Sequence, residues 1–181
     1  MRRPEHLTPL ALAALIALAG CWLPSSSSQS DRLTGTSRGR LDEFARRGWR
    51  FDLGERKAEI IRNLGRPVRI DTQAVANRHR PEVEDTTYTL VYDGLEVCIY
   101  DATQAAKEIL TRLTLTDPRY PTRWDLGVGA SAERVVRVLG EPGRRSEDKL
   151  IYEAGEPVPD QLTFFLEGGS VKKVEWHFYI D

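Results

Sequence analysis

Hydrophobic residues recur at helical spacing in two short stretches of this chain. In the later stretch they occupy positions i, i+3, i+4 and i+7, one stripe of an amphipathic helix: Ala132, Val135, Val136 and Leu139. Ser131 can cap the start of this helix, and Gly140 and Pro142 can end it. The earlier stretch, 60–67, repeats this design. Helices this short are marginal alone, so both predict a sheet on which to pack.

Hydrophobic runs, some of them alternating with polar residues, follow each predicted helix and indicate β-strands. The predicted strands are 88–92, 95–100 and 109–115 in the first half, and 149–152, 161–167 and 171–180 in the second. Turn signals at Asp93-Gly94 and Gly168-Gly169 join neighbouring strands into hairpins. Segment 71–86 is polar and is predicted to be a surface loop. These elements predict the α+β class, with helices packed on one face of an antiparallel sheet.

The two halves share a motif that predicts an internal duplication. Trp49, a following glycine, an aliphatic pair and the sequence Leu-Gly-x-Pro return in the same order from Trp124, each 75 positions later. Such self-similarity indicates repeated structural units. We expect two tandem helix-plus-antiparallel-hairpin repeats, at about 49–117 and 124–181, with the two tryptophans in equivalent places.

The first residues have the layout of a secretory signal peptide. Basic residues precede an apolar run at 10–18, and small residues follow, which predicts a signal peptide over residues 1–20. Residues 18–21, Leu-Ala-Gly-Cys, look like a bacterial lipobox, which implies that the thiol of Cys21 is lipidated. Trp22, not aspartate, comes next. By resemblance to Gram-negative lipoproteins, this permits sorting to the outer membrane. In a Gram-positive host, the same motif implies the outer face of the plasma membrane.

Composition divides the remaining chain into a tether and a folded domain. Residues 21–40 are rich in serine, glycine and threonine and predict a disordered tether, whereas residues 41–181 contain the predicted helices and strands. The whole chain is 40% hydrophobic and 29% charged, with a formal net charge of −1. A nucleic-acid-binding domain normally carries a basic excess, so this balance argues against nucleic acid as a partner.

The motif and strand order resemble a known fold. Each half has a helix that ends in Leu-Gly-x-Pro, then a tyrosine-bearing strand and a hairpin. The motif is Leu64-Gly65-Arg66-Pro67 in the first half and Leu139-Gly140-Glu141-Pro142 in the second. This order resembles the fold of the β-lactamase inhibitor protein. The chain is also similar to the small outer-membrane lipoproteins of the β-barrel assembly machinery. The resemblance covers residues 49–181, and the disulfides of the inhibitor repeats have no counterpart, since only Cys98 lies in this region. It implies a protein-binding module and not an enzyme.

The sequence holds no familiar catalytic or metal-binding motif. It lacks His-Glu-x-x-His, Cys-x-x-Cys, Gly-x-Ser-x-Gly and a P-loop, so we expect no catalytic residues, no metal and no cofactor. Glu175 and His177 share one face of a predicted strand and could serve acid–base chemistry, although a polar pair on a sheet is the favoured interpretation. Cys98 is favoured as a half-buried hydrophobe over a redox thiol.

Strand alternation predicts which side chains a partner could contact. It places one set under the helices: Leu95, Val97, Ile99, Leu162, Phe164, Leu166, Trp176 and Phe178. The alternating set then points away: Glu96, Cys98, Tyr100, Thr163, Phe165, Glu167, Lys173, Glu175, His177 and Tyr179. Aromatic anchors among polar residues are typical of protein-binding surfaces, so we predict a partner-binding face around Tyr100, Phe165, His177 and Tyr179. The alternative is that a loop or tail covers these aromatic residues as core.

These observations favour a non-catalytic, lipid-anchored protein of the bacterial envelope that binds an envelope protein. In a Gram-negative host it is expected at the outer membrane, facing the periplasm. Two alternatives stay open: a periplasmic small-ligand carrier, which would need an enclosed apolar cavity, and an enzyme whose site is not recognisable in the sequence.

Overall fold

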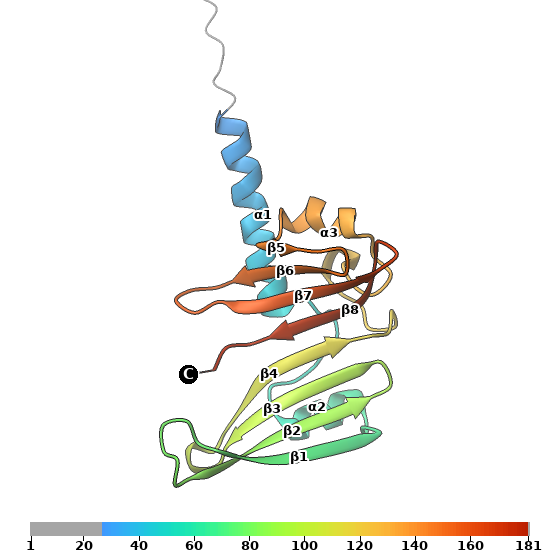
Figure 1. Cartoon of the computed structure of the whole chain (residues 1–181). Helices are drawn as coiled ribbons and strands as arrows, with labels where there is room; N and C mark the ends of the chain where they lie inside the picture. Colours follow the sequence, from blue (N-terminus) through green and yellow to red (C-terminus); the bar gives the residue numbers. More distant parts are fainter. Residues whose placement is uncertain (1–26, 181) are drawn as a thin grey trace, which may run out of the picture.

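The computed structural model describes residues 27–180, with side chains from residue 36 onward. Within this range the chain forms three α-helices and one sheet of eight strands in the order β1-β2-β3-β4-β8-β7-β6-β5 (Figure 1). Every neighbouring pair of strands is antiparallel. The predicted α+β class and antiparallel sheet are therefore confirmed. The predicted signal peptide and Cys21 lie outside the described residues.

The described chain begins with a long helix, and two shorter helices are then each followed by four strands. The helices are α1 (Ser27–Arg47), α2 (Lys57–Leu64) and α3 (Ala132–Leu139), with short 3-10 turns η1 (Thr103–Ala105) and η2 (Arg123–Asp125). The strands are β1 (Arg69–Ala76), β2 (Glu84–Tyr92), β3 (Leu95–Ala102), β4 (Lys107–Leu115), β5 (Arg144–Arg145), β6 (Lys149–Ala154), β7 (Asp160–Glu167) and β8 (Ser170–His177). All the strands that the sequence predicted are present, with β2 beginning earlier and β8 ending earlier than expected.

Local signals of the sequence position helix α3 as expected. The hydroxyl of Ser131 accepts a hydrogen bond from the backbone N–H of Arg134 (3.2 Å), and Val135 is buried. Contacts at the free N–H groups of the first turn and with the Ser131 hydroxyl lower the pKa of Glu133. Gly140 ends the helix with a positive φ of 87°. The helix therefore begins and ends where its caps predict.

Helix α1 replaces much of the expected tether. Residues 27–40 are helical here, where the sequence predicted a tether. Leu41, Phe44 and Ala45 are buried against the sheet, and the Arg40 guanidinium donates to the Val138 carbonyl of α3 (2.7 Å). Once these contacts fix one end, extending a helix is much easier than starting one, so the helix continues into the polar residues before it.

Strand β1 lies in the segment that we predicted as a surface loop. Residues 71–86 contain most of β1, the seven-residue connection 77–83 and the start of β2, so they form a hairpin. Their polarity misled the prediction because β1 is an edge strand whose residues are exposed except for the half-buried Val75. An edge strand with two exposed faces has no reason to alternate between apolar and polar residues.

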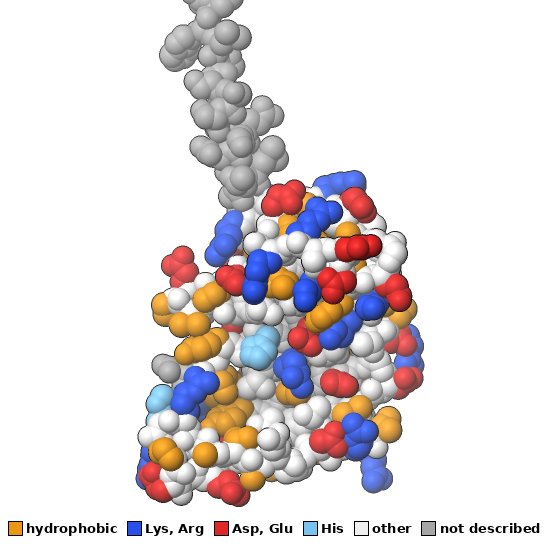
Figure 2. Space-filling view, in the orientation of Figure 1, with side chains coloured by type: hydrophobic (Ala, Val, Ile, Leu, Met, Phe, Trp, Pro, Cys, Tyr) orange, Lys and Arg blue, Asp and Glu red, His pale blue; other side chains and the backbone are white. Residues whose placement is uncertain are grey.

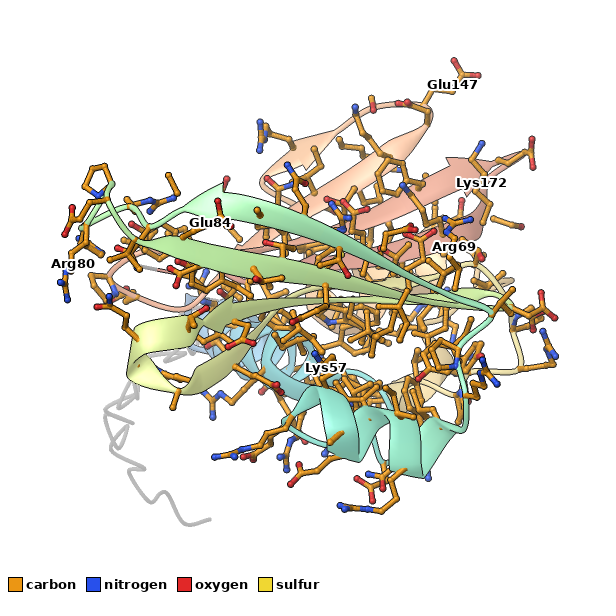
Figure 3. The ribbon with its side chains drawn as sticks, turned by 90° about the horizontal axis from the view of Figure 1, so that it is seen from below. Lys57, Arg69, Arg80, Glu84, Glu147 and Lys172 are labelled. Atoms are coloured by element: carbon orange, nitrogen blue, oxygen red, sulfur yellow. The ribbon has the colours of Figure 1, made fainter. Side chains whose placement is uncertain are left out.

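The helices lie on one face of the sheet and bury the core against it. Figure 3 shows α2 on one side of β1, β2 and β3, with no helix on the other side. Around α1, the Phe44 ring stacks on Trp176, Phe164 and Trp124, at centroid distances of 5.5, 5.9 and 6.2 Å. The indole N–H of Trp176 donates to the Phe44 carbonyl (3.0 Å). One face of the sheet is therefore packed, while the other stays free of helices.

The two predicted repeat tryptophans have different backbone conformations. Trp49 forms an isolated bridge with Thr122, whereas Trp124 lies in η2 with a φ of 53°. The expectation that they occupy equivalent places is therefore not confirmed. The physical reason is that the segment after α1 pairs with the segment before η2, shown by hydrogen bonds from Arg123 N to Gly48 O (2.7 Å) and from Arg50 N to Pro121 O (2.9 Å). The first half follows a long helix, and the second does not.

Candidate functional site

The helix-free face of the sheet presents most of the side chains that alternation predicted. The residues expected under the helices are buried, except for Phe178, which is half-buried. On the opposite face, however, Cys98 and Thr163 are buried although we expected them to be outward. Cys98 and Thr163 are short side chains, and each has a longer side chain directly opposite on one neighbouring strand, Arg112 and Glu175 respectively. Exposure on this face thus depends on side-chain length as well as on alternation.

The four predicted partner-binding residues do not form one cluster. Tyr100 lies on β3, His177 at the end of β8 and Tyr179 just after it, while Phe165 lies on β7 under the ammonium of Lys173, 3.6 Å from the ring centroid. His177 pairs across strands with Gln161, four residues from Phe165 along β7. Four residues of strand span about 13 Å, so Phe165 belongs to a different region of the face.

Tyr100 instead lines a groove at one end of the helix-free face, with a volume of about 460 Å³. The β1–β2 hairpin, the ends of β3 and β4, and the residue after Tyr179 supply its lining: Val75, Ala76, Asn77, Arg78, His79, Thr87, Tyr100, Ala102, Ala105, Lys107, Ile109 and Ile180. Figure 2 shows hydrophobic side chains gathered at the left of this face, where these segments meet. The groove therefore has an apolar floor beside the chain end labelled in Figure 1.

A buried carboxylate fixes the aromatic wall of the groove. The Tyr100 hydroxyl donates a short hydrogen bond to Asp85, which is fully buried and also accepts from the Asn77 side-chain amide (2.6 Å) and the Thr103 backbone N–H (3.0 Å). These hydrogen bonds, that of Tyr100 first, lower the pKa of Asp85. The same bond raises the pKa of Tyr100. Tyr100 is therefore held in place and neutral before anything binds.

The hairpin loop above the groove is also ordered by its own side chains. The Asn77 side-chain oxygen accepts from the backbone N–H groups of His79 and Arg80, both at 2.9 Å, which is an Asx-type turn. Arg80 donates to the Gln104 side chain of η1 (2.6 Å), and Arg78 donates to the Ile180 carbonyl (3.2 Å). Both arginines therefore connect the loop to the opposite wall of the groove.

The charge around the groove is one-sided. Arg78, His79 and Lys107 are among its lining residues, and among the residues that the structure describes no carboxylate lines it. The Asp85 carboxylate, which bonds to Tyr100, is itself buried and accepts hydrogen bonds from groups within the protein. The groove therefore combines an apolar floor with cationic walls, an arrangement that suits an apolar ligand bearing negative charge.

Other polar groups of the face have structural partners. Glu175 forms an ion pair with Lys173 (3.5 Å) and not with His177, which pairs across strands with Arg112. The Cys98 thiol accepts from the Arg112 guanidinium (3.0 Å) and lies 3.4 Å from the Thr89 hydroxyl. Within the described range, no group of three His, Cys, Asp or Glu residues is placed to hold a metal ion.

Sequence reasoning missed most of the groove. Strict alternation along β4 would place Ile109 on the same face as Leu113, but β3 and β4 shift register between Cys98 and Ile99. Such a bulge reverses the facing of the residues beyond it, so Ile109 lies opposite Tyr100 on the helix-free face. Val75 and Arg78 were hidden in the segment predicted as a loop. Only the alternation of β3, which placed Tyr100 outward, pointed to this site.

Comparisons with protein-family models, with curated proteins and with solved structures give no match for this chain. Among residues 27–180, no helix is long and apolar enough to cross a bilayer.

Proposed function

We propose that this protein is a lipid-anchored bacterial envelope protein that binds an extended, acidic and apolar segment of a protein partner in the groove on its helix-free face. One observation carries the proposal: Tyr100 and Ile109 line the groove together with Arg78 and Lys107, and none of the described residues that line it carries a carboxylate. A segment with alternating apolar and acidic side chains matches both properties. The proposed role is binding, and the site needs no catalytic group for it.

The rigidity of the groove supports this role. Asp85 holds Tyr100, and Asn77 holds the loop that carries Arg78. A partner would therefore not have to order these groups on binding, which lowers the entropic cost of association. Because the groove is open along the face, it suits a segment lying across the surface better than an enclosed small ligand.

The position of the groove suits a protein anchored through Cys21. In Figure 1, helix α1 enters at the second half of the sheet, beside α3 and β6, whereas the groove lies among β1 to β4. An anchor preceding α1 would leave the groove half of the sheet directed away from the membrane. The lipobox-like residues 18–21 support the anchor, and several acyl chains hold a protein stably on a bilayer.

We propose further that the folded part arose by duplication, as in the β-lactamase-inhibitor fold that the sequence resembles. Helices α2 and α3 begin and end 75 positions apart, and Gly65 and Gly140 share φ values of 86° and 87° with ψ of −175°. Each helix is followed by four antiparallel strands, and the two sets meet where β4 pairs with β8. The different conformations at Trp49 and Trp124 mark where the copies have diverged.

Peptide titration tests the binding proposal. The probes are synthetic peptides alternating leucine with glutamate, and matched peptides alternating leucine with lysine, followed by backbone amide NMR shifts on the full chain. We expect the acidic peptide alone to bind, with shifts concentrated around Tyr100 and Ile109. Ile109→Glu should weaken that binding at least tenfold, because it places an acid on the floor of the groove.

A matched variant controls for general charge effects. Arg62 is exposed on α2, on the other face of the sheet, so Arg62→Glu changes the net charge without touching the groove. It should leave binding unchanged. Equal binding of both peptides, or shifts centred on the helices, would refute the proposal. If short-chain fatty acids bind in the groove and neither peptide does, the small-ligand alternative would be favoured instead.

The anchor has its own test. Cys21→Ala should release the protein into the soluble fraction or leave it unprocessed, as followed by detergent partitioning and intact mass. A wild-type protein whose mature mass includes no acyl chains would refute lipidation without affecting the groove.

A further inference from the structure

We propose that two copies of this chain associate edge to edge through β1, antiparallel, about a two-fold axis at Ile70. This inference goes beyond partner binding in the groove and does not depend on it. Among residues 27–180, strand β1 pairs only with β2, and no described strand covers its outer edge. Figure 3 looks onto this edge from below, and no other segment crosses in front of β1.

The free edge has backbone groups ready for another strand. The Asn77 N–H donates to the Val83 carbonyl (2.9 Å), directly after the last pair of β1 with β2. Because hydrogen-bonded and non-hydrogen-bonded pairs alternate along an antiparallel ladder, the odd-numbered residues of β1 are those hydrogen-bonded to β2. The N–H and C=O groups of Ile70, Thr72 and Ala74 therefore point outward. An antiparallel partner can pair even-numbered residues with even-numbered residues only.

Apolar exposure selects one end of the edge. Val68 and Ile70 are 80% and 44% exposed, unusual values for large aliphatic side chains, and both precede the middle of the strand. An axis at Ile70 places this side chain against the partner's Ile70 and covers it. Val68 directly precedes β1, and its N–H donates to the Val91 carbonyl of β2 (2.8 Å), so it flanks the paired segment without joining it.

Charge selects the same register. Arg69 and Asp71 lie on the helix-free face and form an exposed ion pair within one chain (2.8 Å). With the axis at Ile70, Arg69 lies opposite the partner's Asp71, and Asp71 lies opposite the partner's Arg69. Both cross-strand pairs are attractive, and like charges are never directly opposed. The edge is therefore complementary to itself, as a two-fold interface requires.

Charge reversal tests this proposal on the full-length chain in detergent by sedimentation equilibrium. Arg69→Asp alone should weaken the dimer at least tenfold, since it opposes two acids across the axis twice. Asp71→Arg alone should do the same with two bases. The double exchange, Arg69→Asp with Asp71→Arg, restores opposite charges and should restore dimerisation. Because the ion pair is exposed, the thermal midpoint should change little in any variant.

Cysteine crosslinking tests the register. Two copies of Ile70→Cys meet at the axis, where directly opposed residues lie about 5.5 Å apart between Cα atoms, within disulfide range. Ile70→Cys should therefore form a disulfide-linked dimer on mild oxidation, whereas Ala74→Cys, equally placed on the strand but distant from its copy, should not. A monomer at all concentrations, a dimer insensitive to the charge reversals, or equal crosslinking at both positions would overturn the proposal.

Discussion

Replacing Phe44 with alanine tests whether α1 belongs to the folded domain. The Phe44 side chain is completely buried and stacks on three other aromatic rings, Trp176, Phe164 and Trp124. Removing a buried phenylalanine costs about 3–5 kcal/mol, and each aromatic pair contributes about 0.5–1.5 kcal/mol beyond its buried area. We therefore expect a loss near the upper end of this range, about 5 kcal/mol.

Urea unfolding followed by tryptophan fluorescence measures this loss. The midpoint should fall while the dependence of the unfolding free energy on urea concentration stays the same, which separates a stability change from a change in the surface exposed. Arg46→Ala, on the exposed side of the same helix, is the control and should have little effect. A loss below about 1 kcal/mol for Phe44→Ala would show that this part of α1 does not pack on the sheet.

Three further outcomes follow from single side chains. Because the pKa of Asp85 is lowered in the folded state, its carboxylate stabilises the protein at neutral pH, and this contribution is lost as the pH falls below about 4. Asp85→Asn should therefore lower the thermal midpoint at pH 7. The thermal midpoint of this variant should also change less on acidification than that of the wild type. Gly94→Ala should destabilise more than Gly169→Ala in urea unfolding: both glycines have positive φ, costing about 1–2 kcal/mol, but only at Gly94 would the new methyl collide with Asp117. Alkylation of the buried Cys98 should be slow until urea unfolds the protein, as followed by mass; rapid labelling in buffer would contradict its burial.

The sequence predicted elements whose signals are local. Helix α3 was found because Ser131, Gly140 and an apolar stripe agree, and β7 because its apolar residues face the helices in alternation. Helix α1 left a weaker signal, since Leu41, Phe44 and Ala45 have helical spacing but only one turn of it, among polar residues. Its length depends on the sheet and on α3, which no local pattern contains.

The groove could be predicted only in part, because most of it depends on how neighbouring strands pair. Tyr100 follows the alternation of β3, so its outward direction could be read directly. Ile109 faces the helix-free side only because of the register shift opposite Cys98, and a bulge depends on how two strands pair, not on one strand alone. Val75 belongs to an edge strand with no alternation. The separate location of Phe165 likewise required the pairing of β7 with β8.

The two edge strands of the sheet differ in length, since β1 has eight residues and β5 only two. A sheet with two long free edges can add chains at both and grow into a filament. Here a further strand could form too few backbone hydrogen bonds with the two residues of β5 to be held stably. Self-association through β1 therefore closes on itself at two copies, and the short strand acts as a terminator that keeps the assembly finite.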